Sequence, residues 1–97
     1  MRLSVIIPVL NESGSLGTTL HALRSRCPVA EVICVDGGSN DNSVEIAKEA
    51  GAMVLTAERG RGRQLHAGAL AASGDVFWFL HADTELRCDA AAQIAGV

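Results

Sequence analysis

Two side chains that suit a divalent metal ion follow the last apolar run of this sequence. The stretch DVFWFLHADT runs from apolar residues straight into His81 and Asp83. If the chain only formed a turn there, glycine, asparagine or proline would be the usual residues. Both side chains point the same way if the backbone stays extended, and carboxylates are suitable ligands for Mg²⁺ or Mn²⁺. The pattern therefore predicts a metal that stabilises charge on a leaving phosphate, although a strand end with Asp83 or Thr84 as a helix cap fits it too.

A second charged group suits a phosphate. The stretch ERGRGRQ places Arg59, Arg61 and Arg63 among two glycines, directly before a helical pattern. Guanidinium groups and the free N–H groups of a helix N-terminus both bind diphosphates. A solvated basic loop is the alternative, but a local cluster in a chain of net charge −3 favours an anionic ligand. The loop matches neither the GxGxxG dinucleotide motif nor the GxxxxGK phosphate loop.

Acidic residues follow the first two apolar runs. Asp36 ends the run EVICVD, and a carboxylate at a strand end can hydrogen-bond a ribose or a base. The glycines after it, in VDGGSND, are explained by a tight turn into a helix. Glu12, in the stretch NES, either contacts a ligand or simply starts a helix, since acidic groups favour that end. The sequence leaves both interpretations open for each acid.

The elements that must position these residues are four short apolar runs at 3–9, 31–36, 52–57 and 75–80. Their continuous β-branched and aromatic residues are typical of strands covered on both faces, as in parallel sheets. Apolar residues recur at helical spacing between them, namely Leu16, Leu20 and Leu23, then Val44, Ala47 and Ala50, then Leu65, Ala69 and Ala72. The order β-α-β-α-β-α-β predicts an open parallel sheet of the Rossmann-like α/β class. All four polar loops then meet at the carboxyl edge of that sheet, where ligands bind.

Composition narrows the class of protein. The 97 residues suffice for one small domain, 1–97, and 48% apolar content allows a core. The negative net charge argues against a nucleic-acid binder, and no apolar run approaches the roughly 18 residues of a membrane span. The first run contains Pro8 and ends in Asn11-Glu12, unlike a signal peptide, so we expect a cytoplasmic protein. Three cysteines without a CxxC pair indicate neither a disulfide framework nor a zinc site.

The predicted sheet is small for a complete enzyme. Four strands leave exposed edges, and the chain ends on DAAAQIAGV, the start of a further helix. We therefore expect a truncated part of a larger domain, with either marginal stability or self-association through an exposed edge.

The four loops together, in this order, resemble family 2 glycosyltransferases of the GT-A type. The matching stretches are SVIIPVLNE, VICVDGGSNDNS, GRGRQLHAGALAASGD and VFWFLHADT, which cover nearly the whole chain. The resemblance implies the donor-binding half of an enzyme that transfers a sugar from a nucleotide-sugar, with the help of a metal, to an unknown acceptor.

The resemblance also implies roles for particular residues. The first loop, from Pro8 to Glu12, would lie against the nucleotide of a UDP- or GDP-sugar, and Asp36 would face the uracil or guanine. The basic loop with Arg59, Arg61 and Arg63 would lie near the diphosphate. His81-Ala82-Asp83 falls on the DxD motif, whose last carboxylate, here Asp83, would bind Mn²⁺ or Mg²⁺.

The chain departs from the family pattern at two positions. Many members carry a second acid after strand two, where this chain has Gly37, and His81 replaces the first acid of the DxD motif. The family's general base and acceptor site follow that motif, so no catalytic residue can be named. A non-catalytic nucleotide-binding fragment or pseudoenzyme is therefore the alternative. A Rossmann-type dehydrogenase is a third interpretation, against which the missing GxGxxG argues.

Overall fold

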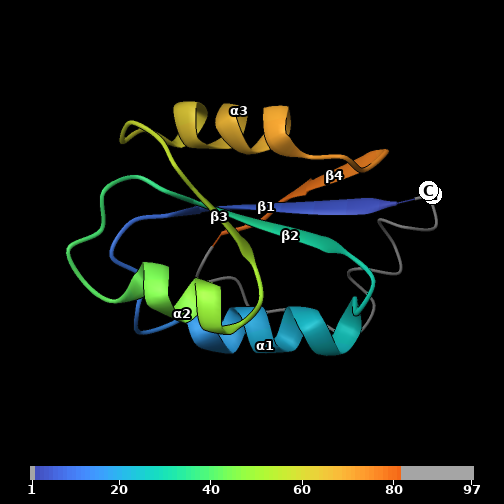
Figure 1. Ribbon diagram of the computed structural model, residues 1–97, viewed down its shortest axis with the longest axis horizontal. Coiled ribbons are helices and arrows are strands. Elements are labelled where there is room, and N and C mark those ends of the chain that lie inside the picture. The colour runs from blue at the N-terminus through green and yellow to red at the C-terminus, as the bar shows by residue number, and fades with distance from the viewer. Residues whose placement is uncertain (1, 82–97) are drawn as a thin grey trace.

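The computed structural model describes residues 2–81 of the chain, and the predicted alternation of strands and helices is present there (Figure 1). The continuous apolar runs form the strands, and the segments with helical spacing form the helices. In chain order the elements are β1 (Leu3–Val9), α1 (Leu16–Arg26), β2 (Glu31–Asp36), α2 (Ser43–Glu49), β3 (Met53–Thr56), α3 (Arg61–Ala71) and β4 (Val76–Phe79).

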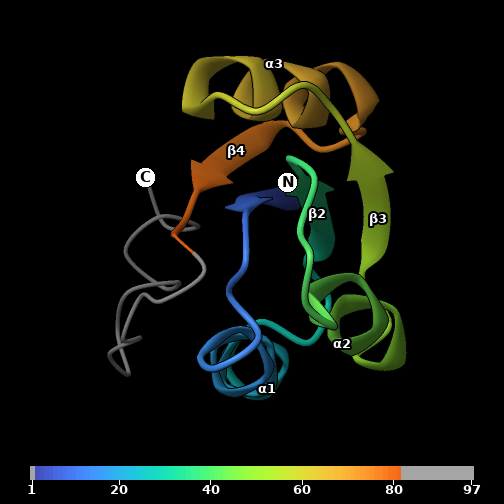
Figure 2. The ribbon, with the colours of Figure 1, turned by 90° about the vertical axis from the view of Figure 1, so that its left-hand side faces the viewer.

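The sheet has the strand order β3-β2-β1-β4, and its paired strands are all parallel. Helices α1 and α2 cover one face, and α3 lies on the other, as the end-on view in Figure 2 shows. The chain moves outward from β1 to β3 through α1 and α2. Helix α3 then carries it back across the sheet to β4, on the other side of β1. The predicted Rossmann-like α/β class is thus confirmed, and the direction of winding reverses between β1 and β4.

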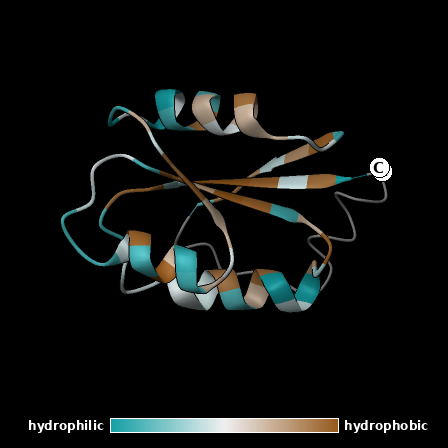
Figure 3. Ribbon diagram, in the orientation of Figure 1, coloured by the Kyte–Doolittle hydropathy of each residue, from teal (hydrophilic) through white to brown (hydrophobic). Residues whose placement is uncertain are grey.

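The core lies in two layers, one on each face of the sheet. Val5, Ile7 and Val9 of β1 pack towards α1, whose predicted leucines are all buried there. Ile6 points to the opposite face and packs, with Ile33 and Val35 of β2, under α3. Figure 3 shows the apolar strands between helices that carry polar residues as well. Successive side chains of β1 therefore pack on opposite faces of the sheet, and because both faces are covered, its apolar run is continuous.

Two of the sequence expectations are corrected by the structure. In α2, Ile46 rather than Val44 packs against the core beside Ala47 and Ala50. The fourth strand was expected to be covered on both faces, but Phe77 and Phe79 of β4 are 40% and 49% exposed. The reason is the strand order, which puts β4 at an edge of the sheet, while α3 packs over β1, β2 and β3.

A close approach of α3 to the sheet positions the loop that precedes this helix. Gly68 faces the strands, and a Cβ there would overlap the Ile6 side chain and lie 3.1 Å from Cγ2 of Val35. Larger side chains at this point would hold the helix further away. None of the helices within residues 2–81 has the length and apolarity to span a bilayer.

Candidate functional site

A cavity of about 270 Å³ opens at the carboxyl edge of the sheet, where the winding reverses between β1 and β4. Open parallel sheets bind their ligands at this kind of position. The cavity brings together five of the residues predicted from the sequence, namely Pro8, Glu12, Arg59, Arg61 and His81. Val9, Leu10 and Gly60, which lie within the predicted loops, also line it, and Gln64 is the lining residue that was not predicted.

The first turn of α3 forms a positively charged wall of this cavity. The helix begins at Arg61, has no acidic residue in its first turn, and receives no side-chain cap. Gly60 precedes it with a φ of 143°, a conformation that favours glycine. The first N–H groups of a helix have no partner within the helix, and the helix dipole adds positive potential. Together with Arg59 and Arg61, this end of α3 suits an anion.

Arg61 and His81 connect the start of α3 to the end of β4. The Arg61 guanidinium contacts Nε2 of His81, and both residues are exposed. An arginine can only donate, so Nε2 of His81 is the acceptor in this contact. Both residues line the cavity.

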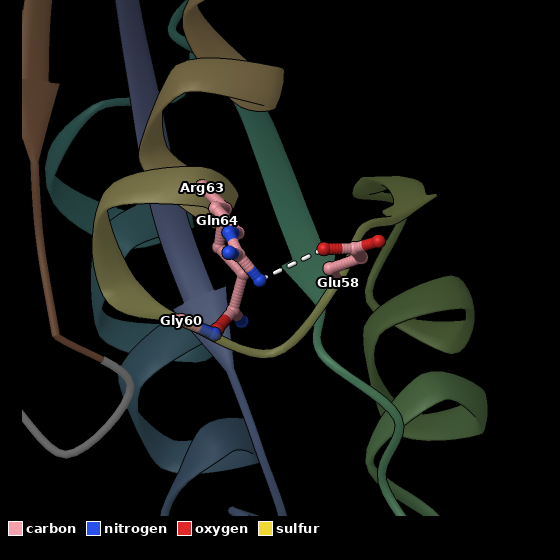
Figure 4. Close-up of polar contacts among 4 residues, drawn as sticks. All are labelled: Glu58, Gly60, Arg63 and Gln64. Carbon is pink, nitrogen blue, oxygen red and sulfur yellow. Dashed lines mark hydrogen bonds and ion pairs between the residues drawn. The ribbon is translucent and has the colours of Figure 1, made fainter.

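Arg63 points elsewhere. Its guanidinium pairs with the Glu58 carboxylate, as Figure 4 shows. The N–O distance is 2.8 Å, and the two side chains are 68% and 79% exposed. Two residues of a helix that are two positions apart point about 200° apart, which separates Arg63 from Arg61. The structure thus does not bring Arg63 to the cavity, and its predicted contact with a diphosphate stays a prediction.

Gln64 is a buried residue that the sequence analysis missed. It is 4% exposed, and its amide nitrogen donates to the backbone oxygens of Val9 at 3.0 Å and Val35 at 2.9 Å. Its amide oxygen accepts from the backbone N–H of Gly60 at 3.2 Å. One side chain therefore joins the ends of β1 and β2 to the start of α3. Its position four residues before Gly68, on the face of α3 that meets the sheet, is the signal that could have revealed it.

Asp36 organises the turn after β2. The residue is 5% exposed, and one carboxylate oxygen accepts from the N–H groups of Gly38 and Ser39, both at 3.0 Å. The other oxygen accepts from the Ser39 hydroxyl at 2.5 Å. Asp36 does not line the cavity, so its predicted contact with a base stays a prediction.

The loop after β1 is tied to this turn at several points. Asn11, with a φ of 54°, donates its N–H to the Ser39 hydroxyl at 2.9 Å and accepts from the N–H of Asn40 at 2.7 Å. The N–H of Glu12 donates to the hydroxyl of Ser43 at 3.0 Å. Asparagine tolerates positive φ better than most residues. These contacts fix the backbone of Glu12 at the cavity.

Asp41 continues the same set of contacts. It accepts from the hydroxyl and N–H of Ser43 and from the N–H of Ser13. The hydrogen bond from the Ser43 hydroxyl is the largest cause that lowers the pKa of Asp41 to about 2. Asp41 thus belongs to the structure of the loops around the cavity.

The predicted metal ligand, Asp83, lies outside the described residues, and its role stays a prediction. Within residues 2–81, no group of three or more histidine, cysteine, aspartate or glutamate side chains could hold a metal ion. Nε2 of His81 is in contact with a cationic guanidinium.

Comparisons with known proteins agree with this fold. The model of the family described as glycosyl transferase family 2 matches residues 4–95. A 4,4'-diaponeurosporenoate glycosyltransferase of Staphylococcus haemolyticus is 34% identical over 88% of this chain and 25% of its own length. An undecaprenyl-phosphate 4-deoxy-4-formamido-L-arabinose transferase of Pectobacterium atrosepticum is 39% identical over 84% of this chain and 29% of its own. The chain thus spans between a quarter and a third of these relatives.

Solved structures share the architecture. Glucosyl-3-phosphoglycerate synthase of Mycobacterium tuberculosis, in complex with Mn²⁺, UDP and glucosyl-3-phosphoglycerate, matches 84% of this chain and 33% of its own. Its TM-score is 0.76 at 27% sequence identity. Residues 1–349 of S. aureus TarS match 99% of this chain and 32% of their own, with a TM-score of 0.88, and at 23% identity this likeness concerns the fold alone. With a family model that covers nearly all of its residues, the chain belongs to glycosyl transferase family 2.

Proposed function

We propose that this chain binds the nucleoside diphosphate part of a nucleotide-sugar donor, in a protein that transfers the sugar to an acceptor. The observation that carries the proposal is the cavity at the carboxyl edge, where Arg59, Arg61 and the start of α3 face the same space as Glu12. A diphosphate would be held by the guanidinium groups and by the free N–H groups of α3. The Glu12 carboxylate can accept hydrogen bonds from ribose hydroxyls.

UDP is the first nucleotide to test. Three solved complexes of glucosyl-3-phosphoglycerate synthase contain UDP or UDP-glucose together with Mn²⁺ or Mg²⁺. The proposal keeps GDP-sugars as the alternative donors and Asp83 as the ligand of Mn²⁺ or Mg²⁺. The cytoplasmic location expected from the sequence is also part of it.

Transfer of the sugar is proposed for the whole protein. The curated relatives are named as transferases, and this chain spans between a quarter and a third of their length. The acceptor and the catalytic residues are therefore not assigned. Binding of a nucleotide without turnover is the alternative, and release of UDP from UDP-glucose by the full chain distinguishes the two.

The experiment that tests the donor site is calorimetric titration with UDP, GDP and dTDP, with and without Mn²⁺. We expect one nucleotide to bind and Arg61→Met to weaken it roughly tenfold or more, since charge-assisted bonds to phosphate are strong. Arg26→Met is the matched control, because Arg26 is an exposed arginine in the last turn of α1, at the other end of the sheet.

Two results would contradict the proposal. One is the absence of nucleotide binding in a folded sample, and the other is equal loss of affinity in Arg61→Met and Arg26→Met. For the metal, Asp83→Ala is expected to remove the dependence of nucleotide affinity on Mn²⁺, and an unchanged dependence would exclude Asp83 as the ligand.

A further inference from the structure

We propose that Gln64 is a positioning residue, which aims the first turn of α3 at the diphosphate. The inference rests on the proposed donor site and adds to it a residue that does not have to touch the ligand through its side chain. Gln64 lines the cavity, and its amide is directed at the backbone around the cavity.

The position of Gln64 in α3 is unusual for a polar side chain. The face of α3 that meets the sheet is otherwise apolar or small, with Leu65, Gly68 and Ala69. Burying an amide among such residues is unfavourable unless its hydrogen bonds are made. Here both amide groups have partners, so the buried amide is compatible with the fold.

The three partners of Gln64 belong to three separate segments. Val9 is the last residue of β1, Val35 lies near the end of β2, and Gly60 is the residue before α3. Val9 and Gly60 themselves line the cavity. The amide therefore fixes the start of α3 relative to the strand ends, and with it Arg61 and the free N–H groups of the first turn.

Gly37 supports the same role from the other side. A Cβ at this position would lie 3.0 Å from Cδ and Oε1 of Gln64 and 3.1 Å from Nε2. These distances are tighter than ordinary van der Waals contact, so a larger residue at position 37 and the amide of Gln64 compete for one space. Gly37 therefore leaves the amide of Gln64 the room that a side chain at position 37 would take.

The test measures the affinities for UDP and for uridine, which lacks the diphosphate, in Gln64→Met and Gln64→Glu. Met keeps the bulk of the side chain without its hydrogen bonds, and an ionised Glu cannot donate to the two carbonyl groups. We expect both variants to bind UDP roughly ten- to a hundredfold more weakly, because a displaced Arg61 and first turn of α3 lose charge-assisted hydrogen bonds to the diphosphate. Affinity for uridine is expected to stay within about twofold, because the nucleoside does not use the start of α3.

The matched control is Ser4→Ala. Ser4 is fully buried and hydrogen-bonded, as Gln64 is, but its partners Glu31 and Gly74 lie at the amino edge of the sheet. This variant is expected to lower the unfolding temperature and to leave both affinities unchanged. Gly37→Ala, which presses on the amide without altering it, is expected to weaken UDP binding in the same selective way.

A double mutant tests whether Gln64 acts through the start of α3. The effect of Gln64→Met on UDP affinity should shrink in the Arg61→Met background, because a misplaced Arg61 and an absent one lose the same contact. Fully additive effects would overturn the role of Gln64 as a positioning residue.

The possible failures are distinguishable. If the unmodified chain binds UDP and Gln64→Met binds it as tightly, the positioning role is overturned and the donor site stands. Equal weakening of UDP and uridine binding, or the same pattern in Ser4→Ala, would assign Gln64 to stability alone. If the folded unmodified chain binds no nucleotide, the proposed function and this inference fall together.

Discussion

The two edges of the sheet hold similar polar groups but arrange them differently. At the amino edge, the Glu31 carboxylate accepts from the Ser4 hydroxyl and from the N–H and hydroxyl of Ser73, and the N–H of Gly74 donates to Ser4. At the carboxyl edge, Asp36 and Gln64 are likewise satisfied within the fold. There, however, Arg59, Arg61 and the start of α3 surround a cavity.

The difference shows how to separate structural charges from functional ones in this protein. The contacts of Glu31 hold the connection from α3 to β4 against the starts of β1 and β2, which serves the fold. At the carboxyl edge, by contrast, Arg59 and Arg61 line the cavity next to this satisfied framework. Changes at the amino edge should therefore affect stability, and changes to these arginines should affect binding.

The largest expected effect is on stability, from Gly74→Ala at the amino edge. A Cβ there would overlap Oγ of Ser4 and lie 2.7 Å from the backbone oxygen of Arg2. We expect the free energy of unfolding to fall by about 3 kcal/mol, measured by urea denaturation. Gly14→Ala is the control, since nothing lies within 4 Å of its added Cβ. Equal effects of the two variants would show that the amino edge is not tightly packed.

Arg59→Met at the carboxyl edge is expected to give the opposite result. Its free energy of unfolding should change by no more than about 0.5 kcal/mol, as is usual for exposed side chains outside structural contacts. Its affinity for UDP should fall several-fold in calorimetric titration, because Arg59 lines the cavity. If Arg59→Met lowers the free energy of unfolding but leaves the affinity for UDP unchanged, Arg59 has a structural role and the two edges do not differ in this way.

A smaller effect is expected on the pH dependence of stability. Hydrogen bonds to the carboxylates lower the pKa of Glu31, mainly from the N–H of Ser73, and lower that of Asp41 to about 2 from its ordinary 3.8. Both groups bind protons less readily in the folded chain than in the unfolded one. Their contribution to stability is therefore complete above the ordinary pKa values and is lost as the pH falls through the lowered ones.

The measurement is the urea midpoint between pH of about 6 and 2, for the unmodified chain, Glu31→Gln and Asp41→Asn. In each variant, the urea midpoint should fall less steeply as the pH decreases. Glu31→Gln should leave UDP affinity unchanged, in keeping with its place at the amino edge. If the urea midpoint of both variants falls with pH as steeply as that of the unmodified chain, other carboxylates control acid unfolding.

The smallest expected effect is on the rate at which buried thiols are labelled. Cys34 of β2 is buried, and burial raises its pKa to about 12, so almost no thiolate forms near neutral pH. Cys27 is also buried and its pKa is raised for the same reason. In a Cys88→Ser background, both thiols should react with a thiol reagent only as the chain unfolds. Labelling should be faster in Gly74→Ala and unchanged in Arg59→Met; rapid labelling of the unmodified fold would contradict the buried positions.

Much of the framework followed from the sequence, because strands and helices depend on local patterns. The runs at 3–9 and 31–36 became β1 and β2 with the same bounds, and the leucines spaced along α1 are all buried. The rule that polar loops gather at the carboxyl ends of parallel strands placed Glu12, Arg59, Arg61 and His81 at one edge. These features need only the residue periods and the parallel order of the strands.

The tertiary structure decided which of these residues share a cavity. The strand order β3-β2-β1-β4 places β4 beside β1, and so brings His81 to Arg61 and exposes Phe77 and Phe79. The turn of the helix separates Arg63 from Arg61, and the packing of α3 on the strand ends gives Gln64 its three partners. The sequence by itself determined the elements and the chemistry of their loops, since both are local. Which loops meet depends on contacts between residues far apart in the chain, and these exist only once the sheet has assembled.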